Sequence, residues 1–382
     1  MEPAPAIGPA ANTPQKIVYL DHVKVLMTVL VILHHTVITY GGPGGWYWRH
    51  PSTGTGPVLG MTLFVSTNQA FFMGLFFLLS AYFVEPSLRR KGAGRFSADR
   101  LKRLGIPMLF YSFIFSPVLI YLVYRYGEQH NVTFLQFLGG FDGWINFGVL
   151  WFAAALLLFT LLFALVYALG WTGERAIRNV SAGSVIGFAL GLGAVTFLVR
   201  LVFPVGWVLQ PLGFQLGHFP QYISLFIIGI LASRGKLAEH LDLRLAKRFA
   251  WAAVILIITV FPLLGWLQAH YHHPGSNFNG GWNIENLLYS FYEQLLGISI
   301  MVALTGISRH KWNQPSAFLA KLSRSAFAAY IFHPLVVIGL SLLLRGLDNP
   351  LLELAVVAPT AVVITFILAG LIVKIPVVKN II

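Results

Sequence analysis

The chain has 382 residues, of which 57% are hydrophobic and only 10% are charged. Soluble domains carry about 25% charged residues, so this composition excludes a soluble globular protein and indicates that most of the chain lies in a bilayer. Cysteine is absent, which excludes disulfides, thiolate metal sites and cysteine nucleophiles. The formal net charge of +13 is attributed to cytoplasmic loops facing anionic lipid, and no nucleic-acid partner is expected.

The N-terminal segment 1–15 is rich in alanine and proline and is expected to be disordered and cytoplasmic. It lacks the basic region and the small-residue cleavage site of a signal peptide. The first apolar segment is therefore expected to remain in the protein as an uncleaved anchor.

Ten apolar segments each approach the roughly 20 residues that a membrane-spanning helix needs, which predicts an all-α polytopic membrane protein. In chain order they are 17–40, 62–85, 105–126, 147–170, 183–203, 219–233, 249–267, 286–306, 318–344 and 352–373. The connections 86–104, 234–248 and 307–324 are rich in arginine and lysine, whereas the alternate connections contain few basic residues. The positive-inside rule then predicts that both termini are cytoplasmic.

The first segment carries a polar stripe. Asp21, Lys24, Thr28, Ile32 and His35 follow steps of three and four residues, so they share one helix face. Lys24 and His35 lie close to three turns apart, about 16 Å along the axis. A charge at the centre of a span costs about 2.5–3.5 kcal/mol, which favours a functional role, with His35 as a general base or nucleophile and Lys24 as its electrostatic partner. The alternative is a lysine that extends to the cytoplasmic surface and a histidine bonded within the bundle.

A second basic group begins the third segment. Arg100 and Arg103 are one turn apart and can grip a phosphate together with a bidentate geometry that lysine lacks. The alternative is an ordinary positive-inside signal, which is the favoured interpretation for Lys102.

Polar residues also follow one face of the eighth segment: Asn286, Tyr289, Ser290, Glu293 and Gly297. An intramembrane glutamate needs a partner, and Lys24, His35 and His333 are the candidates for Glu293. Catalysis and structural support remain equally open for this residue.

In the ninth segment, His333 precedes Pro334. The histidine is a candidate second polar wall of the site. The proline lacks a backbone N–H and can kink the helix.

Two connections rich in glycine and aromatic residues, Gly41–Trp46 and Asn277–Trp282, are candidate sugar-binding loops or interfacial anchors. His270, His272 and His273 resemble a metal cluster, but they lack a neighbouring carboxylate and helical spacing. No metal is expected. The sequence also lacks a GxxxxGK[ST] phosphate-binding loop, which argues against an ATP-driven pump.

Together these segments resemble the membrane acyltransferase 3 family. The run from Tyr19 to His35 resembles the family's first helix, in which a basic residue is followed by ten residues and then a histidine. The other similar stretches are Phe76–Phe83, Arg100–Pro107, Leu150–Phe152, Pro220–Tyr222 and Tyr330–Pro334. The likeness covers about 17–375 and is nearest to the branch that includes glucan-modifying succinyltransferases. One departure is Lys24, where the family usually has arginine.

The resemblance implies an O-acyltransferase of a bacterial inner membrane, with a membrane acyltransferase domain at 16–375 and a cytoplasmic tail at 376–382. Acyl-CoA, as acetyl-CoA or succinyl-CoA, would be the donor substrate and would arrive from the cytoplasm. A hydroxyl of an envelope glycan or similar acceptor would arrive from the outer side.

The resemblance also implies roles for individual residues. His35 would accept the hydroxyl proton or form an acyl-imidazole. Lys24, held by Asp21, would stabilise the oxyanion or hold the CoA entrance, and Glu293 would join the catalytic group. The residues expected to contact substrate are Arg100, Lys102, Arg103, Trp151, Tyr330 and His333.

A secondary transporter of a small polar solute is the runner-up, since ten spans and buried charge also suit one. Transporters usually carry a two-fold internal repeat, and none is recognisable in this sequence. A non-catalytic scaffold is a third possibility, but it leaves the insertion cost of Lys24 and His35 unexplained.

Overall fold

The computed structural model describes residues 17–50, 58–170, 173–270, 277–347 and 349–381. The expected disorder of 1–15 lies outside these residues. Within the described ranges the chain is helical, and its β structure is limited to an isolated bridge between Leu209 and Phe214. Ten helical segments are long and apolar enough to cross a membrane. The predicted all-α fold with ten spans is therefore confirmed, while the side on which the termini lie stays a prediction.

The first five spans follow the predicted segments closely. They are α1 (Val18–Thr39), α2 (Val58–Tyr82) with α3 (Val84–Lys91), the run from α4 (Ala93–Arg100) to Gly127, η4 (Gly148–Leu150) with α8 (Trp151–Ala168), and α9 (Ala182–Arg200). The run to Gly127 comprises η1 (Leu101–Gly105), α5 (Ile106–Phe110), η2 (Tyr111–Phe115), α6 (Ser116–Leu122) and η3 (Val123–Gly127). A short helix, α7 (Phe134–Gly139), follows it.

The remaining spans complete the bundle. They are η5 (Leu216–His218) with α10 (Phe219–Arg234), α12 (Leu243–Ile255) with η6 (Leu256–Val260) and α13 (Phe261–His270), α14 (Ile284–Lys311), α15 (Ala317–Leu344) and α16 (Pro350–Ile372). The helix α11 (Leu237–His240) precedes α12, and α17 (Pro376–Lys379) lies in the predicted C-terminal tail.

The basic segment 86–104 is helical rather than a loop, which corrects the sequence prediction. Arginine and lysine are good helix formers, and Arg89 donates to the Glu85 carboxylate four residues earlier at 2.7 and 2.9 Å. The other Glu85 oxygen accepts from Arg234 at 2.6 Å. This second contact ties α3 to the end of α10.

Small residues bring α2 close to its neighbours. A Cβ atom on Gly229 of α10 would lie 2.5 Å from the Leu78 carbonyl oxygen, and one on Gly297 of α14 would lie 1.9 Å from the Ala70 carbonyl oxygen. Only glycine permits these approaches, as is usual where membrane helices pack tightly. Gln221 spans the junction and donates to the Ala70 carbonyl and to Gln294, both at 2.8 Å.

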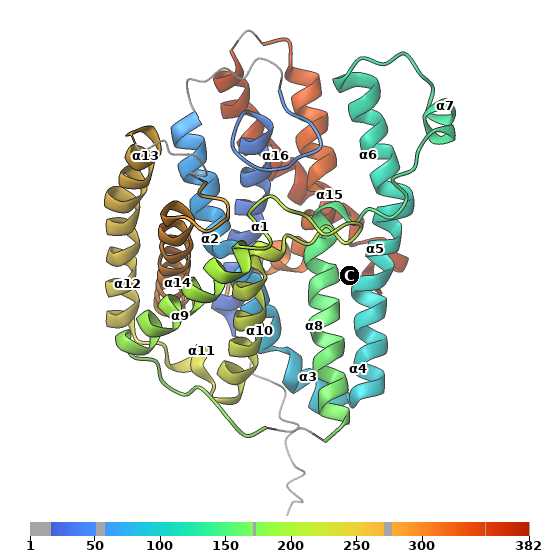
Figure 1. The fold of residues 1–382 in the computed structure, drawn as a ribbon. Coiled ribbons are helices and arrows are strands. Elements are labelled where there is room, and N and C mark those ends of the chain that lie inside the picture. Colours follow the sequence, from blue (N-terminus) through green and yellow to red (C-terminus); the bar gives the residue numbers. More distant parts are fainter. Residues whose placement is uncertain (1–16, 51–57, 171–172, 271–276, 348, 382) are drawn as a thin grey trace, which may run out of the picture.

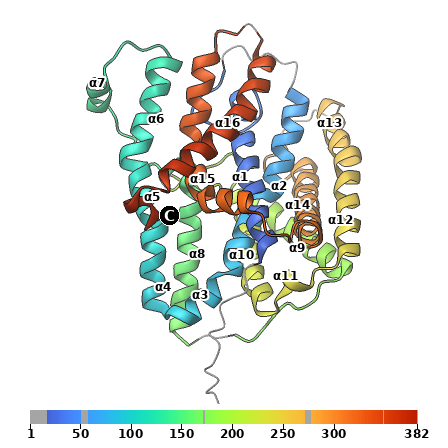
Figure 2. The same ribbon diagram turned by 180° about the vertical axis from the view of Figure 1, so that it is seen from behind.

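Helix α1 occupies the middle of the bundle, while α12 with α13 and the run α4 to α6 form opposite edges (Figures 1 and 2). One face of α1 packs against α15 and α16. Pro334 lies inside α15, next to the histidine at position 333. The polar residues in the C-terminal half of α1 are therefore enclosed by several helices.

Candidate functional site

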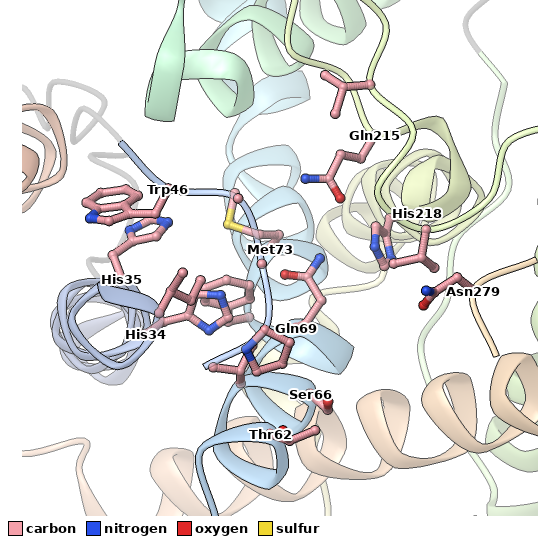
Figure 3. A pocket seen from close by; sticks show the side chains of 18 of the residues that line it. His34, His35, Trp46, Thr62, Ser66, Gln69, Met73, Gln215, His218 and Asn279 are labelled. Atoms are coloured by element: carbon pink, nitrogen blue, oxygen red, sulfur yellow. The ribbon is translucent and has the colours of Figure 1, made fainter. Parts of the chain in front are cut away.

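A cavity of about 1020 Å³ is lined mainly by α1, α2 and α13, with single residues from α8, α10, α14 and α15. His34 and His35 line it from α1, and Gln69 lines it from α2 (Figure 3). Four connections between spans also contribute lining residues, and they include Pro43–Tyr47 and Asn277–Asn279. All four belong to the side that the charge pattern predicts to be extracytoplasmic. The cavity therefore faces the side opposite the basic segments.

The lining is polar but carries no formal charge, because none of its described members is Asp, Glu, Lys or Arg. Its side-chain amides are Gln69, Asn146, Gln210, Gln215, Gln268, Asn277 and Asn279, and its hydroxyls include Thr62, Ser66, Tyr47 and Tyr222. Trp46 and Trp151 add aromatic surface. Such a lining offers hydrogen bonds and ring faces to a ligand, and no ion pair.

His35 belongs to a hydrogen-bonded chain of two imidazoles. His333 Nδ1 lies 2.7 Å from the Tyr330 carbonyl oxygen, and His35 Nδ1 lies 2.8 Å from His333 Nε2. A carbonyl oxygen can only accept, so the neutral His333 donates through Nδ1–H and accepts at Nε2. His35 must then donate through its own Nδ1–H. Its Nε2 retains the lone pair, and no described residue hydrogen-bonds to that atom.

Aromatic contacts hold the orientation of the His35 ring. Trp46 stacks on it with ring centroids 4.1 Å apart and an interplanar angle of 12°, and the hydrogen-bonded His333 ring lies nearly parallel to it with its centroid 5.0 Å away. His34 meets His35 edge to face at 5.5 Å and packs on Phe72. The ring of His35 is therefore confined by neighbours on several sides.

A buried network holds the loop that carries Trp46. Tyr40 donates its single hydroxyl hydrogen to Glu353 at 2.6 Å and accepts from the Ser341 hydroxyl at 3.1 Å, and His50 Nε2 lies 3.1 Å from the same glutamate. All four side chains are buried. Residues on α15 and α16 thus hold both ends of the 41–50 loop.

Figure 3 places His218 at the other wall of the cavity, away from His35. Arg200 Nη2 lies 3.2 Å from His218 Nδ1 and 2.5 Å from Glu293 Oε2. Glu293 thus pairs with Arg200 and approaches His218 at 3.5 Å, so the expectation that its partner is Lys24, His35 or His333 is wrong. Glu293 lies behind the cavity wall and is not part of the lining.

Lys24 shares a continuous helix and one face with His35, as predicted. Its Nζ atom lies 3.2 Å from Asp21 and 5.2 Å from the centroid of the Phe83 ring, and its side chain is 34% exposed. It does not line the cavity. The structure therefore pairs Lys24 with Asp21 and separates both residues from the His35 end of the stripe.

The second basic group also lies apart from the cavity. Arg100 is partly buried and its guanidinium stacks over Phe96 at 4.9 Å, while Lys102 and Arg103 are exposed. They occupy the junction of α4 and η1, which packs against α8. None of the three belongs to the cavity lining.

Trp151 and Tyr330 both line the cavity. Trp151 begins α8 and packs on Tyr222 with ring centroids 5.6 Å apart. The Tyr330 hydroxyl donates to the Val149 carbonyl, which ties α15 to the start of α8. Tyr330 also packs near His333, with ring centroids 6.0 Å apart, whereas Trp151 lies beside Tyr222.

Among the described residues there is no group of three or more side chains that could hold a metal ion. His270 stacks on Trp266 in α13, whereas His272 and His273 lie outside the described residues. Both aromatic loops reach the cavity, through Pro43–Tyr47 in the first and Asn277–Asn279 in the second. Trp282, at the end of the second loop, is 82% exposed.

Two residues at the site escaped the sequence analysis. Arg200 is one of the few basic residues near the alternate connections, yet its side chain is fully buried. A charged residue at the edge of an apolar run is a signal of a buried pair and could have identified it. His218 had no such signal, because it lies in the short 3-10 helix η5, one residue ahead of the predicted segment 219–233.

The sequence matches the family described as "Acyltransferase domain" over residues 17–373. The chain belongs to this acyltransferase family, as an integral membrane member. It is 26% identical to "Glucans biosynthesis protein C" of Escherichia coli, over 61% of this chain and 60% of that protein. The same identity is found with the protein of that name from Salmonella paratyphi A, over 56% of this chain and 57% of the relative.

The chain thus spans about three fifths of the length of these curated relatives. No solved structure matches the chain.

Proposed function

We propose that the protein is an O-acyltransferase of a bacterial inner membrane that moves an acyl group from cytoplasmic acyl-CoA to a hydroxyl of an envelope glycan or a similar acceptor. Family membership and the glucan-related name of the relatives support this proposal. The observation that carries it is the lone pair on His35 Nε2, oriented by His333 at an uncharged polar cavity. The family match also favours this function over a transporter.

In the reaction, the acceptor hydroxyl oxygen attacks the thioester carbonyl carbon while its proton passes to His35 Nε2. The carbon–sulfur bond then breaks, and the CoA sulfur takes the proton from His35. A positioned base contributes about 10²–10⁴ to the rate. The same lone pair could instead attack the thioester and form an acyl-imidazole, which the hydroxyl would then cleave.

The donor side is assigned to the basic end of the bundle. Arg100 and Arg103, with Lys102, bind the CoA phosphates, because guanidinium groups one turn apart suit bidentate phosphate contacts. Lys24 lies about 16 Å along α1 from His35, too far to stabilise an oxyanion there. Its proposed role, with Asp21, is therefore at the CoA entrance.

The uncharged lining distinguishes the two acyl groups. A succinyl group would bring a free carboxylate to the His35 end, where no described lining residue is a lysine or arginine. Burying an unpaired charge is costly. Acetyl is therefore the acyl group that the cavity suits, with Trp151 and Tyr330 as its contacts.

The test measures transfer by the purified protein to a neutral gluco-oligosaccharide, with acetyl-CoA and succinyl-CoA compared as donors. His35→Ala is expected to lower kcat by about 10²–10⁴, whereas the exposed control His130→Ala leaves it unchanged. Full activity of His35→Ala would refute the mechanism. A higher kcat/KM for succinyl-CoA would refute the choice of acetyl.

A further inference from the structure

The tautomer of His218 is set by Arg200. The guanidinium Nη2 lies 3.2 Å from His218 Nδ1, and arginine has donors but no acceptor. His218 Nδ1 must therefore hold its lone pair, so the neutral ring carries its hydrogen on Nε2. The imidazole is buried, lines the cavity, and offers one N–H donor.

Arg200 itself is fully engaged. Its other contacts are the Gly217 carbonyl at 3.2 Å, the Ser290 hydroxyl at 3.5 Å and the Glu293 carboxylate at 2.5 Å. The tyrosine ring of Tyr289 lies 5.5 Å from the guanidinium carbon. The buried pair with Glu293 cancels the charge of Arg200, so the cavity wall gains an oriented donor without gaining a cation.

The two histidines of the cavity thus have opposite polarity. His35 presents an acceptor at one wall and His218 a donor at the other, with Gln69 between them (Figure 3). Gln215 and Asn279 lie beside His218 in the same view. A hydroxyl-rich molecule can use both polarities, whereas a carboxylate or phosphate finds no unpaired cation among the described lining residues.

We propose that His218 is a positioning residue for the acceptor, and that its Nε2–H donates to an oxygen of an uncharged, polyhydroxylated ligand whose reacting hydroxyl lies at His35. Arg200 and Glu293 act through His218 by fixing its tautomer. The proposal rests on the proposed function for the reaction at His35, while the binding of the ligand does not require that reaction.

The experiment compares two substitutions of His218, of which only one places an N–H donor where the imidazole Nε2 lies. In His218→Asn, the shorter amide can still accept from Arg200 but does not reach the Nε2 position. In His218→Gln, the amide nitrogen can occupy that position. The probes are a neutral gluco-oligosaccharide and an oligogalacturonate of the same length. Quenching of the tryptophans at the cavity, Trp46 and Trp151, reports binding without acyl-CoA.

The wild type is expected to bind the neutral probe and to exclude the oligogalacturonate. His218→Asn should raise the Kd for the neutral probe by about three- to tenfold, as for one lost hydrogen bond, and His218→Gln should recover most of this loss. Binding without any transfer by the wild type would refute the proposed function while leaving this subsite intact.

Three results would overturn the proposal: equal Kd values for His218→Asn and the wild type, equal binding of the two probes, or no saturable binding of the neutral probe. Thermal unfolding of both variants in detergent verifies that they remain folded. A His218→Asn variant that keeps the wild-type unfolding temperature and loses affinity separates positioning from support of the fold.

Discussion

The Tyr330 carbonyl determines the direction of every hydrogen bond in the His333–His35 chain. Because the carbonyl can only accept, both imidazoles donate through Nδ1 and the lone pair emerges at His35 Nε2. An additional proton on the pair would either occupy that atom or place two donors against each other. The arrangement therefore serves as a base only while both rings are neutral.

Without His333, the His35 ring is expected to adopt either neutral tautomer and to lose its fixed orientation. His333→Leu should lower kcat by roughly 10²-fold or more, since loss of the orienting partner of a catalytic imidazole has cost as much as about 10⁴-fold. His333→Gln should retain more activity, because its amide oxygen can accept from His35 Nδ1. Initial rates with saturating donor measure the effect, and His130→Leu is the control. A wild-type kcat for His333→Leu would show that the hydrogen bond from His35 to His333 does not support catalysis.

Single residues show what could be predicted from the sequence. His35, Trp151 and Tyr330 were all singled out and all three line the cavity, whereas His333 was also singled out but lies behind the lining and hydrogen-bonds to His35. The partner of Glu293 was predicted wrongly, because helical spacing identifies a face of one helix and does not reveal which helix it meets. The pairing with Arg200 of α9 is a property of tertiary packing.

At the level of elements, the tightest contact is the crossing of α2 and α14 at Gly297. Gly297→Ala would place a Cβ atom 1.9 Å from the Ala70 carbonyl oxygen, so the backbones must separate. We expect a loss of about 1–3 kcal/mol in the free energy of unfolding. Gly187→Ala in α9, where nothing lies within 4 Å of the added atom, should instead gain roughly 0.5–1 kcal/mol.

Thermal unfolding in detergent measures both glycine variants. Equal unfolding temperatures for the two would show that α2 and α14 are separated further than the structure indicates.

The loop that carries Trp46 depends on a distant element. Glu353→Leu would leave the hydroxyl of Tyr40 without its 2.6 Å partner and remove the 3.1 Å contact with His50. An unsatisfied buried polar group costs about 1–3 kcal/mol, so the unfolding temperature should fall. The exposed Glu128→Leu is the matched control. No shift in Glu353→Leu would show that the network does not hold the loop.

The positions of the spans could be predicted from hydropathy, because length and apolarity determine which segments can cross a bilayer. The residues at which the spans begin and end could be predicted less well from the sequence. The basic segment 86–104 is helical on both sides of Gly92. Its helix formers and the Glu85–Arg89 spacing are local signals, whereas the contact between Glu85 and Arg234 of α10 is a tertiary interaction that the sequence does not reveal. Connections such as 204–215 fold into the cavity for the same kind of reason.

For the whole molecule, the predicted topology can be tested by labelling, since the chain contains no cysteine and a single introduced thiol gives no background. Asn131→Cys lies between the third and fourth spans, and Glu239→Cys lies between the sixth and seventh. A membrane-impermeant maleimide should label position 131 in intact cells and position 239 only after permeabilisation. The reverse labelling pattern would show that the protein has the opposite orientation in the membrane, with the cavity open to the cytoplasmic side.

The uncharged cavity has a consequence for how the two substrates are recruited. In the proposed function, exposed cations such as Arg103 would attract an anionic donor over distances that dissolved salt screens, with a Debye length of about 8 Å at physiological ionic strength. A lining whose described residues carry no formal charge would exert no comparable attraction on an acceptor. Rising ionic strength should therefore raise the KM for acyl-CoA and leave the KM for a neutral acceptor unaffected.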